Sequence, residues 1–434
     1  MRPAVLAAML GGRKGSVLTQ SQSIWHNPGF RAYLGSTGFS GMALAMQQLL
    51  LSWMLIGILQ LPADQVGLLQ AIIGIPGVLL MLMGGASADR SDPREMLIKV
   101  YFIAPILPIF LIFMEMYQWL GVATVTIWGL GMSVVQSYSM PGQQAILNRI
   151  TRSSVQQGVT AATAIGFVVQ VVGLILAGQI DNFGITPVLT LQAVGLVLAG
   201  LMMMRIEPVV PAVTAASDTS SVQVIRDGLV ATYRSPIIFH TLLITFSSSI
   251  FNAGSFITVF PFIVKRIYDG DAWLLAVLMA VFFAGATLSN IILLRYMPLK
   301  APGRLFLLMQ LSRILVIYLM WIEPAFWVMV VATIGWGLNM GVTTNLARAI
   351  VQESAPNEYL GRIMSVFSVG MVGSAPIGAI ILGWMIERFG TLNALMPAMA
   401  LSLILFLYGA FMSPVWGYRS ALPEADDALN KSDG

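Results

Sequence analysis

The chain has 434 residues, of which 57% are hydrophobic and only 10% are charged, and its mean hydropathy is +0.83. So much apolar surface exceeds what one water-soluble core can bury, which predicts an all-α integral membrane protein. The sequence contains no Cys, which excludes disulfides, thiolate catalysis and cysteine-bound zinc. The net charge of +4 comes from basic residues spread among loops, which favours membrane topology rather than a nucleic-acid partner as its cause.

The N-terminus has the outline of a short secretory signal, but its apolar run, residues 3–10, is followed by Arg13 and Lys14 where an uncharged cleavage site is needed. We therefore interpret residues 1–32 as a cytoplasmic tail. A spanning helix needs about twenty mostly apolar residues. This rule predicts about twelve helices, near residues 33–58, 65–88, 96–119, 121–146, 157–181, 185–205, 237–262, 272–294, 304–322, 325–347, 362–387 and 391–414.

The positive charges orient these spans. When alternate connections are assigned to one side, that side collects nearly all Lys and Arg residues, and the other side keeps only Lys265, Arg266 and Arg388. The positive-inside rule then predicts that both termini are cytoplasmic. An inner, cytoplasmic membrane is the compatible location.

One long hydrophilic segment divides the spans six and six. It predicts an N-terminal six-helix bundle at 33–205, a cytoplasmic linker at 206–236, a C-terminal six-helix bundle at 237–414 and a tail at 415–434. Apolar residues at helical spacing in 222–234 predict a surface helix within the linker. Three short similarities recur between the halves at offsets of 204 to 206 residues, by subtraction of their positions, which favours two pseudo-repeated bundles.

The connection between the second and third predicted helices, residues 85–94, carries a specific pattern. It resembles the helix 2–3 loop signature of the major facilitator superfamily: Gly, three residues, Asp, a basic residue, any residue, Gly and then basic residues. Gly85, Asp89, Arg90 and Arg94 match this pattern, whereas Asp92 stands in place of the second Gly. Residues 26–31, 234–236 and 359–365 extend the likeness toward the enterobactin-exporter and drug-efflux branch.

This resemblance implies a secondary transporter that works by alternating access and exports a drug- or siderophore-like molecule. It also implies a gating contact between Asp89 and the start of the eleventh helix, where Arg362 is the nearest basic residue in the sequence. Such a contact forms in one state and breaks in the other. The plainer alternative is that these charges only anchor the loop in the cytoplasm.

In that superfamily the first, fourth, seventh and tenth helices line the substrate cavity. Polar residues in these spans should point away from lipid, toward the substrate or toward other helices. They favour a neutral or amphipathic substrate. The candidate cavity residues are Gln47, Gln48, Ser133, Gln136, Ser137, Ser248, Asn252, Asn339 and Thr343.

Charge inside the spans is scarce. Arg313 lies well within the ninth predicted helix, and we expect it to be buried with backbone partners. The candidates for proton coupling are Asp89, His240 and Glu115, because no carboxylate occurs in the four cavity-lining spans.

Other classes of protein fit less well. An intramembrane enzyme needs a nucleophile, a metal set or an acid–base pair, but the only histidines are His26 and His240 and no zinc-protease motif occurs. No cofactor is expected, and without a Walker-type phosphate loop the energy should come from an ion gradient, with protons as the coupling ion and a monomer as the functional unit. An uptake or facilitated-diffusion permease, and a nontransporting receptor or assembly factor, remain as alternatives.

The predicted orientation can be tested by cysteine labelling, since the chain has no native Cys. We expect a membrane-impermeant thiol reagent added to intact cells to label an Asp64→Cys variant and to miss an Asp92→Cys variant. The reverse pattern would show that the orientation is wrong.

Overall fold

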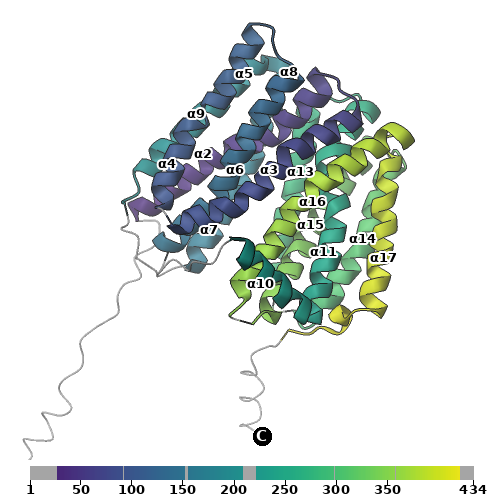
Figure 1. Ribbon diagram of the computed structural model, residues 1–434. Helices are drawn as coiled ribbons and strands as arrows, with labels where there is room; N and C mark the ends of the chain where they lie inside the picture. The colour runs from purple at the N-terminus through teal and green to yellow at the C-terminus, as the bar shows by residue number, and fades with distance from the viewer. Residues whose placement is uncertain are drawn as a thin grey trace, which may run out of the picture.

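The computed structural model describes residues 27–90, 92–151, 155–208, 221–297, 299–356 and 358–420, although the side chains of residues 82–90, 152–157, 159–160 and 221–225 are outside this description. Over these ranges the chain consists of helices and their connections, with no strand. Figure 1 shows two groups of helices, one purple to blue and one green to yellow. We call them the first and the second bundle.

The first bundle begins with α2 (Pro28–Trp53), and the Asn27 side chain accepts hydrogen bonds from the backbone N–H groups of Gly29 and Phe30. The last turns of this helix, Met54–Ile58, are π-helical. The other helices are α3 (Ala63–Arg90), α4 (Pro93–Ile103), α5 (Ile106–Met116), α6 (Val122–Ile150), α7 (Val155–Ala177), α8 (Ile180–Phe183) and α9 (Ile185–Met204). The predicted third span is thus two short helices, α4 and α5, separated by Ala104 and Pro105.

The second bundle begins with α11 (Pro236–Gly254), which continues through the π-helical turns Ser255–Val259 and Ile263–Ile267 on either side of α12 (Phe260–Phe262). Pro261 lies between the two π turns and has no backbone N–H to donate. The other elements are α13 (Ala272–Tyr296), α14 (Pro302–Trp321), α15 (Phe326–Ser354), α16 (Leu360–Phe389), the 3-10 turn Asn393–Leu395, α17 (Met396–Phe411) and the 3-10 turn Pro414–Gly417.

Eleven helices within the described ranges are long and apolar enough to cross a membrane, and they coincide with eleven of the predicted spans. The remaining span, predicted at 121–146, is the 29-residue helix α6. It is more polar than the others because it carries several Ser and Gln residues, and it packs against α2, α3 and α4 inside the first bundle. The predicted twelve-helix, multi-pass arrangement is therefore confirmed.

The two bundles meet chiefly through two helix pairs, α3 with α16 and α7 with α13. In the sequence, residues 67–71 of α3 resemble 273–277 of α13, and 173–178 of α7 resemble 378–383 of α16. The two contacts between the bundles therefore use equivalent pairs of helices. Glycine permits the close approach: a Cβ at Gly67 of α3 would collide with the Ala379 carbonyl of α16, and Gly383 of α16 lies against the Ala63 carbonyl of α3.

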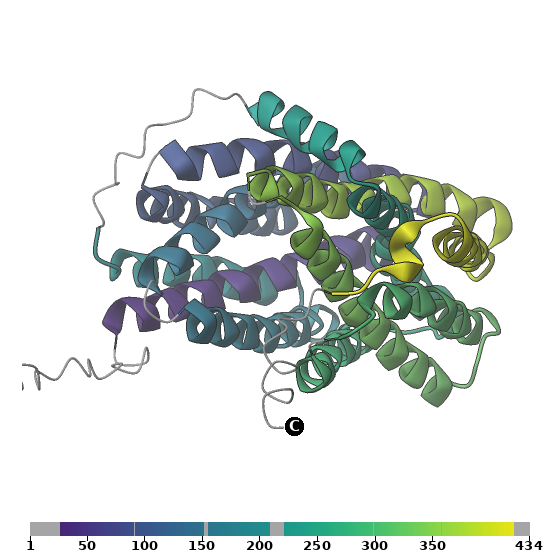
Figure 2. The same ribbon diagram turned by 90° about the horizontal axis from the view of Figure 1, so that it is seen from below.

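The predicted linker helix is α10 (Ser221–Arg234), which packs against α16 at one end of the molecule (Figure 2). Its Gly228 lies against the backbone carbonyl of Arg362, and Leu229 and Tyr233 are exposed. This end, where α2 begins and α17 ends, is the Asp92 face. The opposite end, where α2 finishes and α3 begins, is the Asp64 face.

The packing of α13 on α15 should depend on Gly337, where any Cβ would collide with the Phe282 carbonyl. We expect Gly337→Val to lower the melting temperature of the purified protein by several degrees, because overpacking costs about 1–3 kcal/mol. The control is Gly166→Val in α7, where a Cβ meets no atom within 4 Å. Equal melting temperatures for the two variants would contradict this account of the contact.

Candidate functional site

Two adjoining hollows lie between the bundles, with volumes of ≈ 340 and ≈ 330 Å³. They share two wall residues, Gln48 of α2 and Ile257 of the first π turn after α11. The larger, which we call the aromatic hollow, is lined chiefly by the second bundle and includes Phe256, Phe282, Phe283 and Phe306. The smaller, the amide hollow, is lined chiefly by the first bundle and includes Gln47, Gln48, Gln70, Gln136 and Gln170. Together they form a central cavity bounded by both bundles.

Most of the predicted cavity residues lie on these walls. Gln47, Gln48, Ser133 and Gln136 line the amide hollow, and Gln48, Ser248, Asn252 and Thr343 line the aromatic hollow. That these residues contact the substrate stays a prediction.

Two predicted residues do not line either hollow. The Ser137 hydroxyl donates to the carbonyls of Gly77 and Ser133, both at 2.7 Å, and so joins α6 to α3. The Asn339 amide lies behind the wall, where it donates to the Met309 carbonyl at 2.6 Å and accepts from Arg313. In this conformation both side chains bond to other parts of the protein and do not face the cavity.

The wall also includes Arg313, which was not among the predicted cavity residues. It extends from α14, is only 3% exposed and lines the aromatic hollow beside Gln310 of the same helix. The expectation that it bonds to backbone groups is wrong, because its partners are side chains of α11, α14 and α15. A Gln and an Arg three residues apart, and so on one face of a largely apolar helix, were the available signal.

At the Asp64 face the bundles are joined by a buried amide. Gln70 of α3 donates from Nε2 to the Ile257 carbonyl at 2.9 Å, and its Oε1 accepts from the Thr258 hydroxyl at 2.6 Å. Both partners lie in the π turn Ser255–Val259, where the backbone departs from regular α-helical bonding. This pair of hydrogen bonds crosses from one bundle to the other beside the cavity.

Two carboxylates reinforce the same face by bonding to helix N-termini across the boundary. Asp181 accepts from Trp53 Nε1 at 2.9 Å in its own bundle and from the Ala272 backbone N–H of α13 at 2.8 Å. Glu387 of α16 accepts from the Ala63 backbone N–H of α3 at 2.8 Å. Helix N-termini favour negative charge, so both acids stabilise contact between the bundles.

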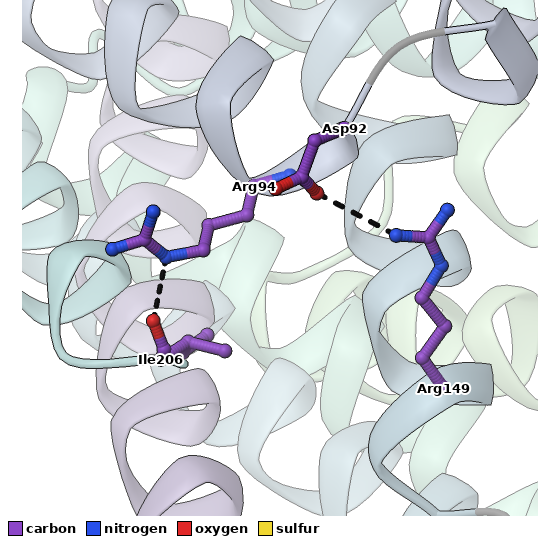
Figure 3. Close-up of polar contacts among 4 residues, drawn as sticks. All are labelled: Asp92, Arg94, Arg149 and Ile206. Carbon is purple, nitrogen blue, oxygen red and sulfur yellow. Dashed lines mark hydrogen bonds and ion pairs between the residues drawn. The ribbon is translucent and has the colours of Figure 1, made fainter. Parts of the chain in front are cut away.

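At the Asp92 face, one set of charged contacts lies within the first bundle (Figure 3). Asp92 accepts from the Arg94 backbone N–H at the start of α4 and pairs with Arg149 of α6 at 3.5 Å. The Arg94 side chain donates to the carbonyls of Ile206 and Met204 at the end of α9, at 2.5 and 2.8 Å. The departure from the loop signature thus has a structural reason, since Asp92 followed by proline is a good helix start.

The gating contact predicted for Asp89 lies outside the described side chains, as do Gly85 and Arg90. Arg362, its predicted partner, pairs with Asp227 of α10 at 3.1 Å. The pair ties the linker helix to the start of α16.

The other two candidates for proton coupling are held away from the cavity walls. Glu115 accepts from the Thr186 hydroxyl at 2.5 Å, which joins α5 to α9. His240 shares a hydrogen bond of 2.6 Å between Nδ1 and the Tyr408 hydroxyl, which joins α11 to α17.

The family of the chain is decided by a sequence comparison. The family model described as the Major Facilitator Superfamily matches residues 33–378. The chain belongs to the major facilitator superfamily. Its members are transporters, so this facilitator is a secondary transporter rather than an enzyme, and its substrate is a small molecule. No curated protein sequence matches it significantly.

Solved structures share its fold at low sequence identity. A mutant of the nucleoside transporter NupG has a TM-score of 0.71 and 13% identity over 89% of this chain and 100% of that one. A POT family transporter in complex with 5-aminolevulinic acid has a TM-score of 0.68 and 13% identity over 89% and 96%. A bacterial homolog of the human lysosomal transporter Spinster, inward-facing and unoccupied, has a TM-score of 0.67 and 12% identity over 92% and 99%.

If Gln70 holds the Asp64 face closed, its loss should open the cavity on that face. In a chain whose single cysteine is Thr343→Cys, we expect Gln70→Leu to increase labelling by an impermeant maleimide from the Asp64 face about fivefold or more. Two lost hydrogen bonds are worth about 1 kcal/mol each.

The matched control is Gln192→Leu, which removes a buried hydrogen bond to the Ala43 carbonyl within the first bundle. It should leave the labelling rate unchanged. Equal rates for the Gln70 variant and its parent would show that this bond does not control access.

Proposed function

We propose that this facilitator exports a small amphipathic molecule, drug- or siderophore-like, across the inner membrane as a monomer with both termini in the cytoplasm. The observation that carries the proposal is the central cavity, which is bounded by both bundles and joined at the Asp64 face by hydrogen bonds between them. A site of this kind can be exposed to one side at a time. Export rather than uptake rests on the resemblance of residues 26–31, 234–236 and 359–365 to the efflux branch.

We propose that the units 33–205 and 237–414 rock as rigid bodies around the cavity. The bonds of Gln70, Asp181 and Glu387 would hold the Asp64 face closed while substrate enters from the Asp92 face. In the opposite state the signature residues would close the Asp92 face, with Asp89 bonded to the start of α16. The gating residues of this proposal are Gly85, Asp89, Arg90, Arg94 and Arg362.

Proton antiport is the proposed energy source, with Asp89, His240 and Glu115 as candidate carriers. A facilitated-diffusion permease is the second candidate. It is favoured by the hydrogen bonds that hold His240 against Tyr408 and Glu115 against Thr186, because a coupling group should change its access to water with the transport cycle.

Liposomes that hold the purified protein with its Asp92 face outward can separate the two candidates. With an acidic interior, we expect a substrate chosen from a panel of siderophores, macrolides and dyes to accumulate against its own gradient, and a proton ionophore to release it. Protein-free vesicles give the background. Equilibration that ignores the pH gradient would contradict antiport and support the permease, and no protein-dependent movement of any compound would contradict export of this substrate class.

A further inference from the structure

The aromatic hollow has a cationic wall residue whose partners are all neutral. Arg313 Nε donates to Asn339 Oδ1 at 3.1 Å, and Nη1 donates to Gln310 Oε1 at 3.1 Å and to the Ser248 hydroxyl. Nη2 has no hydrogen-bond partner among the residues that the structure describes. One edge of the guanidinium is therefore held by the protein and one nitrogen remains available.

No carboxylate balances this charge within the described ranges. The four ion pairs found there join Lys99 to Glu95, Arg149 to Asp92, Arg266 to Glu387 and Arg362 to Asp227, all at helix ends or in connections. The residues that line the two hollows include no Asp or Glu. Buried charges in proteins are ordinarily paired, and intramembrane cations mark ion or substrate sites.

The guanidinium is fixed in place rather than free to turn away. The Asn339 amide that accepts from Arg313 donates in turn to the Met309 carbonyl at 2.6 Å and to the Ser312 hydroxyl at 2.8 Å. These two bonds determine which end of the amide faces Arg313. Asn339 thus holds the cation at the wall of the hollow in advance of any ligand.

Aromatic and methionine side chains form an apolar part of the same wall. Phe256 packs against Phe282 with ring centroids 4.3 Å apart and against Phe283 at 5.8 Å. Met340 and Met371 complete this surface with flexible side chains that adapt to different shapes. A cation fixed beside such a wall is complementary to a molecule with one anionic group and an aromatic or aliphatic body.

We infer that the aromatic hollow binds an amphipathic monoanion, with its carboxylate or similar acid group on Arg313 and its apolar body against Phe256, Phe282 and Phe283. This inference rests on the proposed function, because it names the substrate class of the same cavity. It narrows the neutral or amphipathic substrate predicted from the sequence to an amphipathic acid.

The test compares two compounds that differ in charge and hardly in shape, naphthalene-2-carboxylate and naphthalene-2-carboxamide. Equilibrium binding to the purified full chain is measured for both. We expect the wild type to bind the carboxylate about tenfold or more tightly, since a hydrogen bond to a charged group in a buried site is stronger than one to a neutral group. Arg313→Gln should remove this preference, and Arg313→Lys should retain part of it.

Two further variants keep the result interpretable. Gln310→Glu places a carboxylate next to Arg313 with almost no change in shape, so it should also remove the preference even if Arg313→Gln fails to fold. Arg304→Gln makes the same substitution on the same helix. The Arg304 guanidinium lies 5.8 Å from the centre of the Trp416 ring, and Arg304 does not line the hollow. This variant should keep the full preference.

Equal affinity of the wild type for the two compounds, binding of neither, or a preference that survives in Gln310→Glu would overturn the inference. Because binding is measured without a gradient, the result is separate from transport. Charge-selective binding without movement of the carboxylate in vesicles would contradict the proposed function and leave the site intact. Transport of the carboxamide and carboxylate at equal rates would contradict the inference and leave the transporter intact.

Discussion

A helix that ends at the edge of a bilayer leaves backbone N–H and C=O groups without partners, and in a low-dielectric environment each one is costly. At the Asp64 face two such N–H groups, together with one carbonyl of a π turn, find partners across the boundary between the bundles. The Ile257 carbonyl accepts from Gln70, the Ala272 N–H donates to Asp181, and the Ala63 N–H donates to Glu387. Water can replace these partners when the bundles separate. Such bonds suit the proposed alternating access, in which this face is closed in one state and open in the other.

The same physics gives the cavity its chemical character. Polar side chains cluster where the bundles face each other, and the aromatic hollow keeps a cation whose described partners are neutral. An anion that neutralises Arg313 would lower the cost of moving through the membrane. If that anion leaves a cell whose interior is electrically negative, the membrane potential favours its export by about 2.3 kcal/mol per charge for each 100 mV. The inferred substrate charge and the permease alternative are therefore compatible.

The sequence was sufficient for the fold because spanning helices need long apolar segments and because the backbone of each segment bonds to itself. The spans, the linker helix α10 and the positions of Gln48, Ser248 and Asn252 on the cavity wall follow from that rule and from the superfamily resemblance.

Contacts that depend on packing could not be predicted in this way. Gln70 bonds to the second bundle because the Ile257 carbonyl, in the π turn after α11, lies within reach of its amide. Arg313 reaches the cavity because Ser248, Gln310 and Asn339, from three helices, converge around it. Asp92 fits its place in the loop as a helix cap that also meets Arg149 from the distant end of α6.

Alternating access requires the bundles to move so that one face closes as the other opens. Distances between spin labels test it directly, with one pair at Asp64 and Phe389 on the Asp64 face and another at Arg205 and Arg295 on the Asp92 face. We expect conditions that lengthen the first distance to shorten the second. Single distances that never change, or two distances that change in the same direction, would contradict it.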